Sequence, residues 1–232
     1  MDNHLPSLEW ALLVGGSVLM VATLGLAQAG ERVWNFARDT PGKPPSGFVF
    51  ALTGQGSPGE WQIVKDSAAP SQPNVLAQTS QDKTSYRFPL AIAAGTSYKN
   101  LTVRVKFKTI SGMVDQGAGL VFRLLDKDNY YVVRANALED NFRLYHVVNG
   151  KRVQFAGADF KVTPQVWHEI RVEGRGDEFK CYYDGQLQIT AKDATFMDAG
   201  EIGLWTKADS VIYFDDLVVQ EIPRVLSSAA NP

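Results

Sequence analysis

Short runs of Val, Ile, Phe and Tyr, in which apolar and polar residues alternate, fill most of this chain. A period of two is typical of β-strands with one buried face, and no stretch of 47–222 keeps a helical period of about 3.6 over three turns. Turn residues separate the runs, most clearly Asn149-Gly150 between LYHVV and KRVQF, which is a strong hairpin signal. The pattern predicts strands at 48–52, 61–64, 75–78, 85–89, 101–109, 119–125, 130–135, 142–148, 151–155, 168–173, 178–183, 186–190, 201–206 and 211–221.

More than ten strands at near-regular spacing do not fit one flat sheet, so we expect two packed antiparallel sheets. The predicted fold class is an all-β, two-sheet jelly-roll β-sandwich over residues 47–222. The composition agrees, because 45% hydrophobic and 11% aromatic residues are too many for a disordered chain. A formal net charge of -2 argues against nucleic acid as a partner. The single Cys181 excludes an intramolecular disulfide and a zinc site made only of thiolates.

The N-terminal part differs from the rest, since residues 1–29 contain no Lys or Arg and the run over 11–29 is uncharged and predicts a hydrophobic helix. Ala27-Gln28-Ala29 has the small-x-small form of a signal-peptidase site, which favours a cleaved secretory signal and a periplasmic or secreted domain. A helix of this length reaches about 28 Å, near the thickness of a bilayer core, so an uncleaved membrane anchor and a buried soluble helix are the alternatives. Residues 30–46, rich in Pro and Gly, are predicted as a linker, and 223–232 as a disordered tail.

Polar and aromatic side chains concentrate in residues 117–152. Counting by twos along the strands places guanidinium, amide and phenol groups on one sheet face, contributed by Arg123, Tyr130, Arg134, Asn136, Arg143 and Tyr145. Aromatic rings stack on the apolar faces of sugars, and Arg and Asn side chains hydrogen-bond hydroxyl groups, so this face predicts carbohydrate binding. A solvated face covered by surface ion pairs and a protein interface are the alternatives.

Carboxylates lead to two further predictions. A carboxylate inside a strand needs a charged partner, so Asp215 and Asp216 are predicted to help bind a structural calcium ion or, alternatively, to pair with a neighbouring arginine. Glycosidases need two carboxylates beside the scissile bond, and Glu139 and Asp209 are the candidate acid and base, although no spacing in the sequence requires them to meet.

Four segments together form a distinctive pattern: GLVFRLLDKDNYYVVRANALEDNFRLY, the NGK hairpin, WHEIRVEGRGDEFKCYYDGQLQ and GLWTKADSVIYFDDLVV. With these segments, residues 47–221 resemble the concanavalin A-like lectin/glucanase superfamily, and within it the bacterial 3-keto-disaccharide-hydrolase-like domains, often labelled family 16 glycoside hydrolase-like. The Glu-x-Asp-x-x-Glu strand motif of family 16 is missing, which argues against glucanase chemistry. The resemblance implies a concave sheet that binds carbohydrate through Arg123, Arg134, Asn136, Arg143, Tyr145, Trp205 and Lys207.

Three functions fit these observations. The first is an exported domain that binds a glycan on its concave sheet face without strong catalysis of its own. The second, which the resemblance implies, is a hydrolase of 3-keto-glycosides with Glu139 or Asp209 as acid and base. The third is a structural subunit of an envelope complex that residues 11–29 anchor to a membrane.

Overall fold

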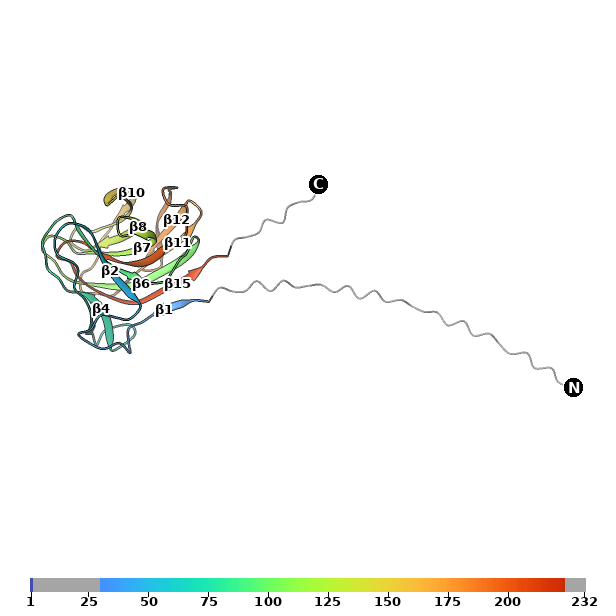
Figure 1. Cartoon of the computed structure of the whole chain (residues 1–232), viewed down its shortest axis with the longest axis horizontal. Helices are drawn as coiled ribbons and strands as arrows, with labels where there is room; N and C mark the ends of the chain where they lie inside the picture. Colours follow the sequence, from blue (N-terminus) through green and yellow to red (C-terminus); the bar gives the residue numbers. More distant parts are fainter. Residues whose placement is uncertain (2–29, 224–232) are drawn as a thin grey trace.

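The computed structural model describes Met1 and residues 30–223, so the predicted N-terminal helix and residues 224–232 of the predicted tail lie outside the described residues. Fifteen strands in the described part of the chain form two antiparallel sheets, which face each other as the layers of a β-sandwich (Figure 1). Each of the predicted strands overlaps a strand of the structure, so the predicted all-β jelly-roll sandwich is confirmed. None of the described residues belongs to a helix long and apolar enough to span a bilayer.

The two sheets combine strands from distant parts of the chain. Sheet A has the spatial order β13 (Gln186–Lys192), β12 (Glu178–Tyr183), β11 (His168–Arg175), β6 (Leu101–Ser111), β15 (Val211–Glu221), β4 (Asn74–Gln78) and β3 (Trp61–Lys65), and β1 (Arg32–Trp34) also pairs with β15. Sheet B has the spatial order β10 (Lys151–Asp159), β9 (Asn141–Val148), β8 (Asn129–Asn136), β7 (Gly117–Asp126), β14 (Glu201–Thr206), β5 (Arg87–Ala93) and β2 (Phe48–Gly54). Because β14 lies beside β7, sheet B brings residues near 205 next to residues near 119.

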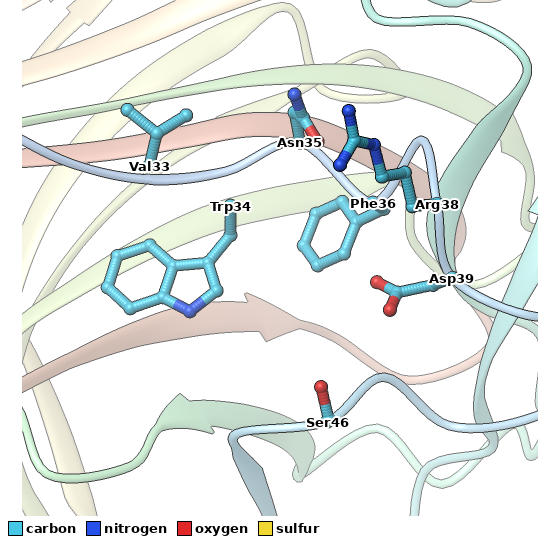
Figure 2. A pocket seen from close by; sticks show the side chains of 7 residues that line it. All are labelled: Val33, Trp34, Asn35, Phe36, Arg38, Asp39 and Ser46. Carbon is cyan, nitrogen blue, oxygen red and sulfur yellow. The ribbon is translucent and has the colours of Figure 1, made fainter.

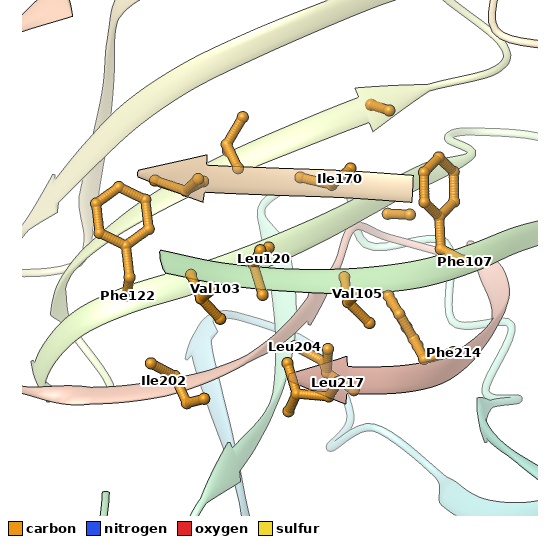
Figure 3. Close-up of a cluster of buried hydrophobic side chains, with 14 of the residues drawn as sticks. Val103, Val105, Phe107, Leu120, Phe122, Ile170, Ile202, Leu204, Phe214 and Leu217 are labelled. Atoms are coloured by element: carbon orange, nitrogen blue, oxygen red, sulfur yellow. The ribbon is translucent and has the colours of Figure 1, made fainter. Parts of the chain in front are cut away.

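The main hydrophobic core fills the space between the sheets. In β6, Val103, Val105 and Phe107 point inward and are fully buried, while the residues between them are partly exposed, as the period of two predicts. Figure 3 shows these side chains together with Leu120 of β7 and Leu204 of β14, which come from sheet B. Burial of each such side chain contributes about 1.5–3 kcal/mol, so this layer is the main source of stability.

Sheet B has a second buried apolar layer on the side away from this core, to which Phe88, Tyr145 and Trp205 belong. The sheet curves so strongly that distant strands meet across this layer. The hydroxyl of Tyr86, just before β5, donates a hydrogen bond of 2.8 Å to the carbonyl of Gly150 in the turn between β9 and β10. Since four strands lie between β5 and β10 in the sheet, this contact requires the outer face of sheet B to be concave.

Part of the predicted linker belongs to the sandwich. Strand β1, drawn in blue in Figure 1, pairs with β15, and Phe36 is 4% exposed within the core, with its ring 5.8 Å from that of Phe48. Trp34 and Phe36, which lie side by side in Figure 2, line a hollow of about 220 Å³ that also contacts Arg38 and Asp39. The linker prediction was wrong for this segment, because a strand of three residues is too short to show a period of two.

Candidate functional site

A cluster of charged side chains lies at one end of the concave face, centred on Arg134 near the end of β8. Nη2 of Arg134 lies 2.7 Å from Oε2 of Glu139 and 3.2 Å from the hydroxyl oxygen of Tyr145, and its Nη1 lies 2.9 Å from Oδ1 of Asn141. The register of β8 and β9, in which Asn136 faces Asn141, places these groups side by side. The guanidinium is thus held by two partners on β9 and by one on the turn that joins β8 to β9.

A second ion pair joins this group from distant parts of the chain. Lys207, directly after β14, donates a hydrogen bond to the carboxylate of Asp115, and its Nζ lies 3.8 Å from Oε1 of Glu139. Asp115 is fully buried and also accepts a 3.0 Å hydrogen bond from Nδ2 of Asn136. We refer to the whole group as the polar cluster, made up of Asp115, Arg134, Glu139, Asn141, Tyr145 and Lys207.

Asp209, predicted as a catalytic carboxylate, anchors a loop. It is buried, and its two carboxylate oxygens accept backbone N–H bonds from Met113 at 2.8 Å, Val114 at 3.0 Å and Asp115 at 3.1 Å. These bonds fix the loop before β7 and so position the Asp115 carboxylate. The structure therefore gives Asp209 a structural task and leaves Glu139 as the exposed carboxylate of the polar cluster.

Asn136, predicted as a ligand contact, is also a support. Its side-chain oxygen accepts the backbone N–H groups of Leu138 at 2.9 Å and Glu139 at 3.1 Å, while its amide donates to Asp115. Asn136 is fully buried, so it cannot touch a ligand directly. It holds the turn that presents Glu139 and links that turn to the loop before β7.

The electrostatics of the cluster keep Glu139 ionised. Burial alone would raise the pKa of Glu139, but the Arg134 guanidinium, helped by Asn141 and Lys207, lowers it to about 2. Burial raises the pKa of Asp115, an effect that the hydrogen bond from Lys207 partly offsets. At neutral pH the exposed group of the site is therefore an anionic hydrogen-bond acceptor.

Accessibility decides which members of the cluster a ligand meets first. The side chain of Glu139 is 41% exposed, that of Lys207 is 15% exposed and that of Arg134 only 4%. Trp205, predicted to stack on a sugar, is fully buried and stacks on Phe88, with ring centroids 5.1 Å apart. A ligand therefore meets the Glu139 carboxylate and the Lys207 ammonium, whereas the Trp205 ring is out of its reach.

Two predicted arginines do not take part in the polar cluster. Arg143 lies on the predicted face, opposite Arg134, but its guanidinium donates to the carbonyl of Ala158 at 2.9 Å and pairs with Asp159 at the edge of the sheet. Its partners therefore lie on β10, away from Glu139.

Arg123 points away from the concave face. A bulge follows Phe122 in β7, and Arg123 itself has a φ of 48°. The side chain of Arg123 therefore no longer follows the alternation of the two sheet faces along β7. The buried guanidinium donates to the carbonyls of Lys99 and Phe196 and lies over the ring of Phe179 from sheet A. The prediction for Arg123 was wrong because a bulge shifts every later position to the other face.

Asp215 and Asp216, predicted as calcium ligands, have partners within the protein. Ser71 donates its backbone N–H to Asp215 at 2.7 Å and its hydroxyl to Asp216 at 2.6 Å, and Lys106 pairs with Asp216 at 3.0 Å. A bulge at this point in β15 lets both carboxylates reach the same serine. The ion pair that was the alternative prediction is present, with lysine in place of arginine. Among the described residues, no three or more His, Cys, Asp or Glu side chains form a group that could hold a metal ion.

Three side chains of this face were missed by the sequence analysis, namely Asp115, Asn141 and Arg152. Arg152 extends across the concave face, with its guanidinium 4.5 Å from the ring centroid of Tyr145, 4.7 Å from that of Phe88 and 5.5 Å from that of Trp205. The Asn149-Gly150 turn contained the signal for Arg152, because a two-residue hairpin sets Arg152 opposite Val147 and therefore on the face of Tyr145. No local pattern marks Asp115, whose partners are distant in the sequence.

Comparison with known proteins gives a consistent result for the fold. No known family model matches the chain. Over 98 residues the chain is 31% identical to a levanase of Bacillus subtilis, a match that covers 41% of this chain and 14% of the levanase. The carbohydrate-binding module CBM66 from Bacillus subtilis superposes with a TM-score of 0.60 at 20% identity, covering 74% of this chain and 95% of the module.

Two lectin domains have the same fold. The carbohydrate recognition domain of Emp47p has a TM-score of 0.55 at 11% identity and covers 84% of this chain and 98% of its own. The lumenal domain of VIP36, solved with Ca2+ and Man3GlcNAc, has a TM-score of 0.53 at 12% identity and covers 72% of this chain and 86% of its own. The chain therefore has the same two-sheet jelly-roll fold as this carbohydrate-binding module and these two lectin domains, as its sequence predicts.

Proposed function

We propose that this chain is a carbohydrate-binding domain whose ligand contacts the polar cluster on the concave face of sheet B. The similar proteins support this function, because a carbohydrate-binding module and two lectin domains have the same fold. Within the chain, the observation that carries the proposal is the arrangement of Glu139, whose exposed carboxylate is held between the nearly buried cations of Arg134 and Lys207.

The chemistry of the cluster suits sugar hydroxyl groups, which both donate and accept hydrogen bonds. The Glu139 carboxylate accepts them, and the Lys207 ammonium donates them. Both groups are already held by Arg134 and Asp115, so binding does not need to order them. Because ordering a free side chain costs about 0.5–1.5 kcal/mol, this arrangement favours affinity.

The proposal is tested with the full chain on a glycan array, followed by calorimetry with the glycan that binds best. Glu139→Ala is expected to weaken that binding at least about tenfold, since it removes the exposed acceptor. Glu178→Ala is the control, because Glu178 is an exposed carboxylate paired with Lys192 on sheet A. Wild-type affinity in a folded Glu139→Ala variant would refute the site, and an array without any bound glycan would refute the function.

Hydrolysis of 3-keto-glycosides is the second candidate, and the local likeness to a levanase supports it. The geometry favours binding over hydrolysis. A pKa of about 2 makes Glu139 a weak base that is already deprotonated at neutral pH, and the Asp209 carboxylate is occupied by three backbone N–H groups. Incubation of the protein with a 3-keto-disaccharide decides between binding and hydrolysis. If the wild-type protein turns the disaccharide over and Glu139→Gln does not, the protein is a hydrolase.

We also propose that the domain acts in the periplasm or outside the cell, and the uncharged run over 11–29 with Ala27-Gln28-Ala29 supports this. Mass spectrometry of the N-terminus is the test, with cleavage after Ala29 as the expected result. An intact N-terminus on a protein that needs detergent would instead favour the membrane-anchored structural subunit.

A further inference from the structure

Arg152 is a partly buried cation without an anionic partner in the described part of the chain. Its guanidinium lies against the rings of Phe88, Tyr145 and Trp205, within 5.5 Å of each ring centroid. Its Nη1 is buried and has no hydrogen-bond partner among the described residues, and none of their carboxylates lies within 4.0 Å of it. A buried guanidinium nitrogen in this state is costly, because it has lost water without gaining an acceptor.

The charges around Arg152 leave one cation in excess. Arg134 pairs with Glu139, and Lys207 pairs with Asp115, so these four charges balance. Arg152 is the fifth charge, and its guanidinium lies against the same Tyr145 ring as that of Arg134. Burial lowers the pKa of Arg152, and the positive charge of Arg134 lowers it further.

Two guanidinium nitrogens at this place lack an acceptor in the described structure. Nε of Arg134 is buried and without a hydrogen-bond partner in the described structure, as is Nη1 of Arg152. A neutral sugar would leave the positive charge uncompensated, whereas a carboxylate matches the planar fork of a guanidinium with two parallel hydrogen bonds. The residue Arg152 remains partly accessible to solvent, so a ligand group can reach it.

We propose that the ligand is an acidic glycan and that Arg152 binds the carboxylate of a uronic acid residue beside the polar cluster. This inference rests on the proposed carbohydrate-binding function and specifies the class of sugar. In the complex, the hydroxyl groups of the uronic acid contact Glu139 and Lys207, while its carboxylate neutralises the excess cation.

A purely structural task for Arg152 is the competing explanation, since its side chain covers the fully buried Phe88 and Trp205. Arg152→Met separates the two, because methionine keeps an unbranched apolar side chain over these rings but has no charge and no donor. Arg152→Lys keeps the charge without the planar fork. Arg104→Met is the control, because Arg104 is a partly exposed arginine on the outer face of sheet A.

The experiment measures binding of the full chain to oligosaccharides of galacturonic, glucuronic and mannuronic acid, each compared with its own neutral methyl ester and with a sulfated galactan. We expect wild-type protein and Arg104→Met to prefer one of the acids to its ester at least about tenfold, a preference that shrinks when NaCl rises from about 50 to 500 mM. Arg152→Met is expected to lose this preference, and Arg152→Lys to retain part of it.

Three results would overturn the inference and leave the proposed function in place: equal binding of acid and ester, an unchanged preference in folded Arg152→Met, or binding of the sulfated galactan alone. Absence of binding to every acidic and neutral glycan would instead remove the proposed function itself. Circular dichroism and thermal unfolding of each variant establish that it is folded before binding is compared.

Discussion

Replacing Asp209 by asparagine should destabilise the fold and weaken ligand binding, although Asp209 touches no ligand. Its oxygens accept N–H groups of Met113 at 2.8 Å, Val114 at 3.0 Å and Asp115 at 3.1 Å. An asparagine oxygen can keep the bonds to Val114 and Asp115, but its amide nitrogen then faces the N–H of Met113, donor against donor. Losing one hydrogen bond to a charged group costs about 1.5–3 kcal/mol, so we expect a loss of about 2–3 kcal/mol.

Urea unfolding followed by tryptophan fluorescence measures this loss of unfolding free energy. In thermal unfolding, the midpoint temperature should fall by about 5–10 °C. The loop that Asp209 anchors contains Asp115, the partner of Lys207, so affinity for the glycan should fall with stability. Asp198→Asn is the control, because Asp198 is an exposed carboxylate. A folded Asp209→Asn variant with the stability of the control, or one that loses only turnover of a substrate, would refute the anchoring explanation and restore a catalytic one.

Three other predictions concern stability. Burial raises the pKa of Asp215 to about 7, so between pH 4 and 7 the folded state holds a proton that the unfolded state has lost. The free energy of unfolding, measured from pH 4 to 7.5, should therefore fall with rising pH by up to about 4 kcal/mol. Asp215→Asn should flatten this dependence on pH. Arg123→Met should lower stability, through loss of two bonds to buried carbonyls, and leave glycan affinity unchanged; a selective loss of affinity would return Arg123 to the site. Phe36→Ala should cost about 3 kcal/mol in urea unfolding, whereas a true linker residue would cost almost nothing.

Most of the fold could be predicted from the sequence because its signals are local. The alternation in β6 and the Asn149-Gly150 turn are set by residues within a few positions of one another. The same counting placed Arg134 and Tyr145 on one face of sheet B, which the structure confirms. It failed where regularity is interrupted, as at the bulge that redirects Arg123.

The polar cluster itself is the part that local signals could not define. Lys207 and Asp115 are 92 positions apart, and only the pairing of β14 with β7 brings their strands together. Likewise, no counting along one strand shows that the curvature of sheet B buries Trp205 beneath Arg152.

The sequence by itself therefore determined the all-β class, the strands and the face on which most side chains stand, because period and turn chemistry act between neighbours along the chain. Only the tertiary structure decided which of those side chains are accessible, which are paired and which cation is left without a partner. Sheet curvature, bulges and pairing between distant strands control these properties, and they arise from the packing of the whole sandwich.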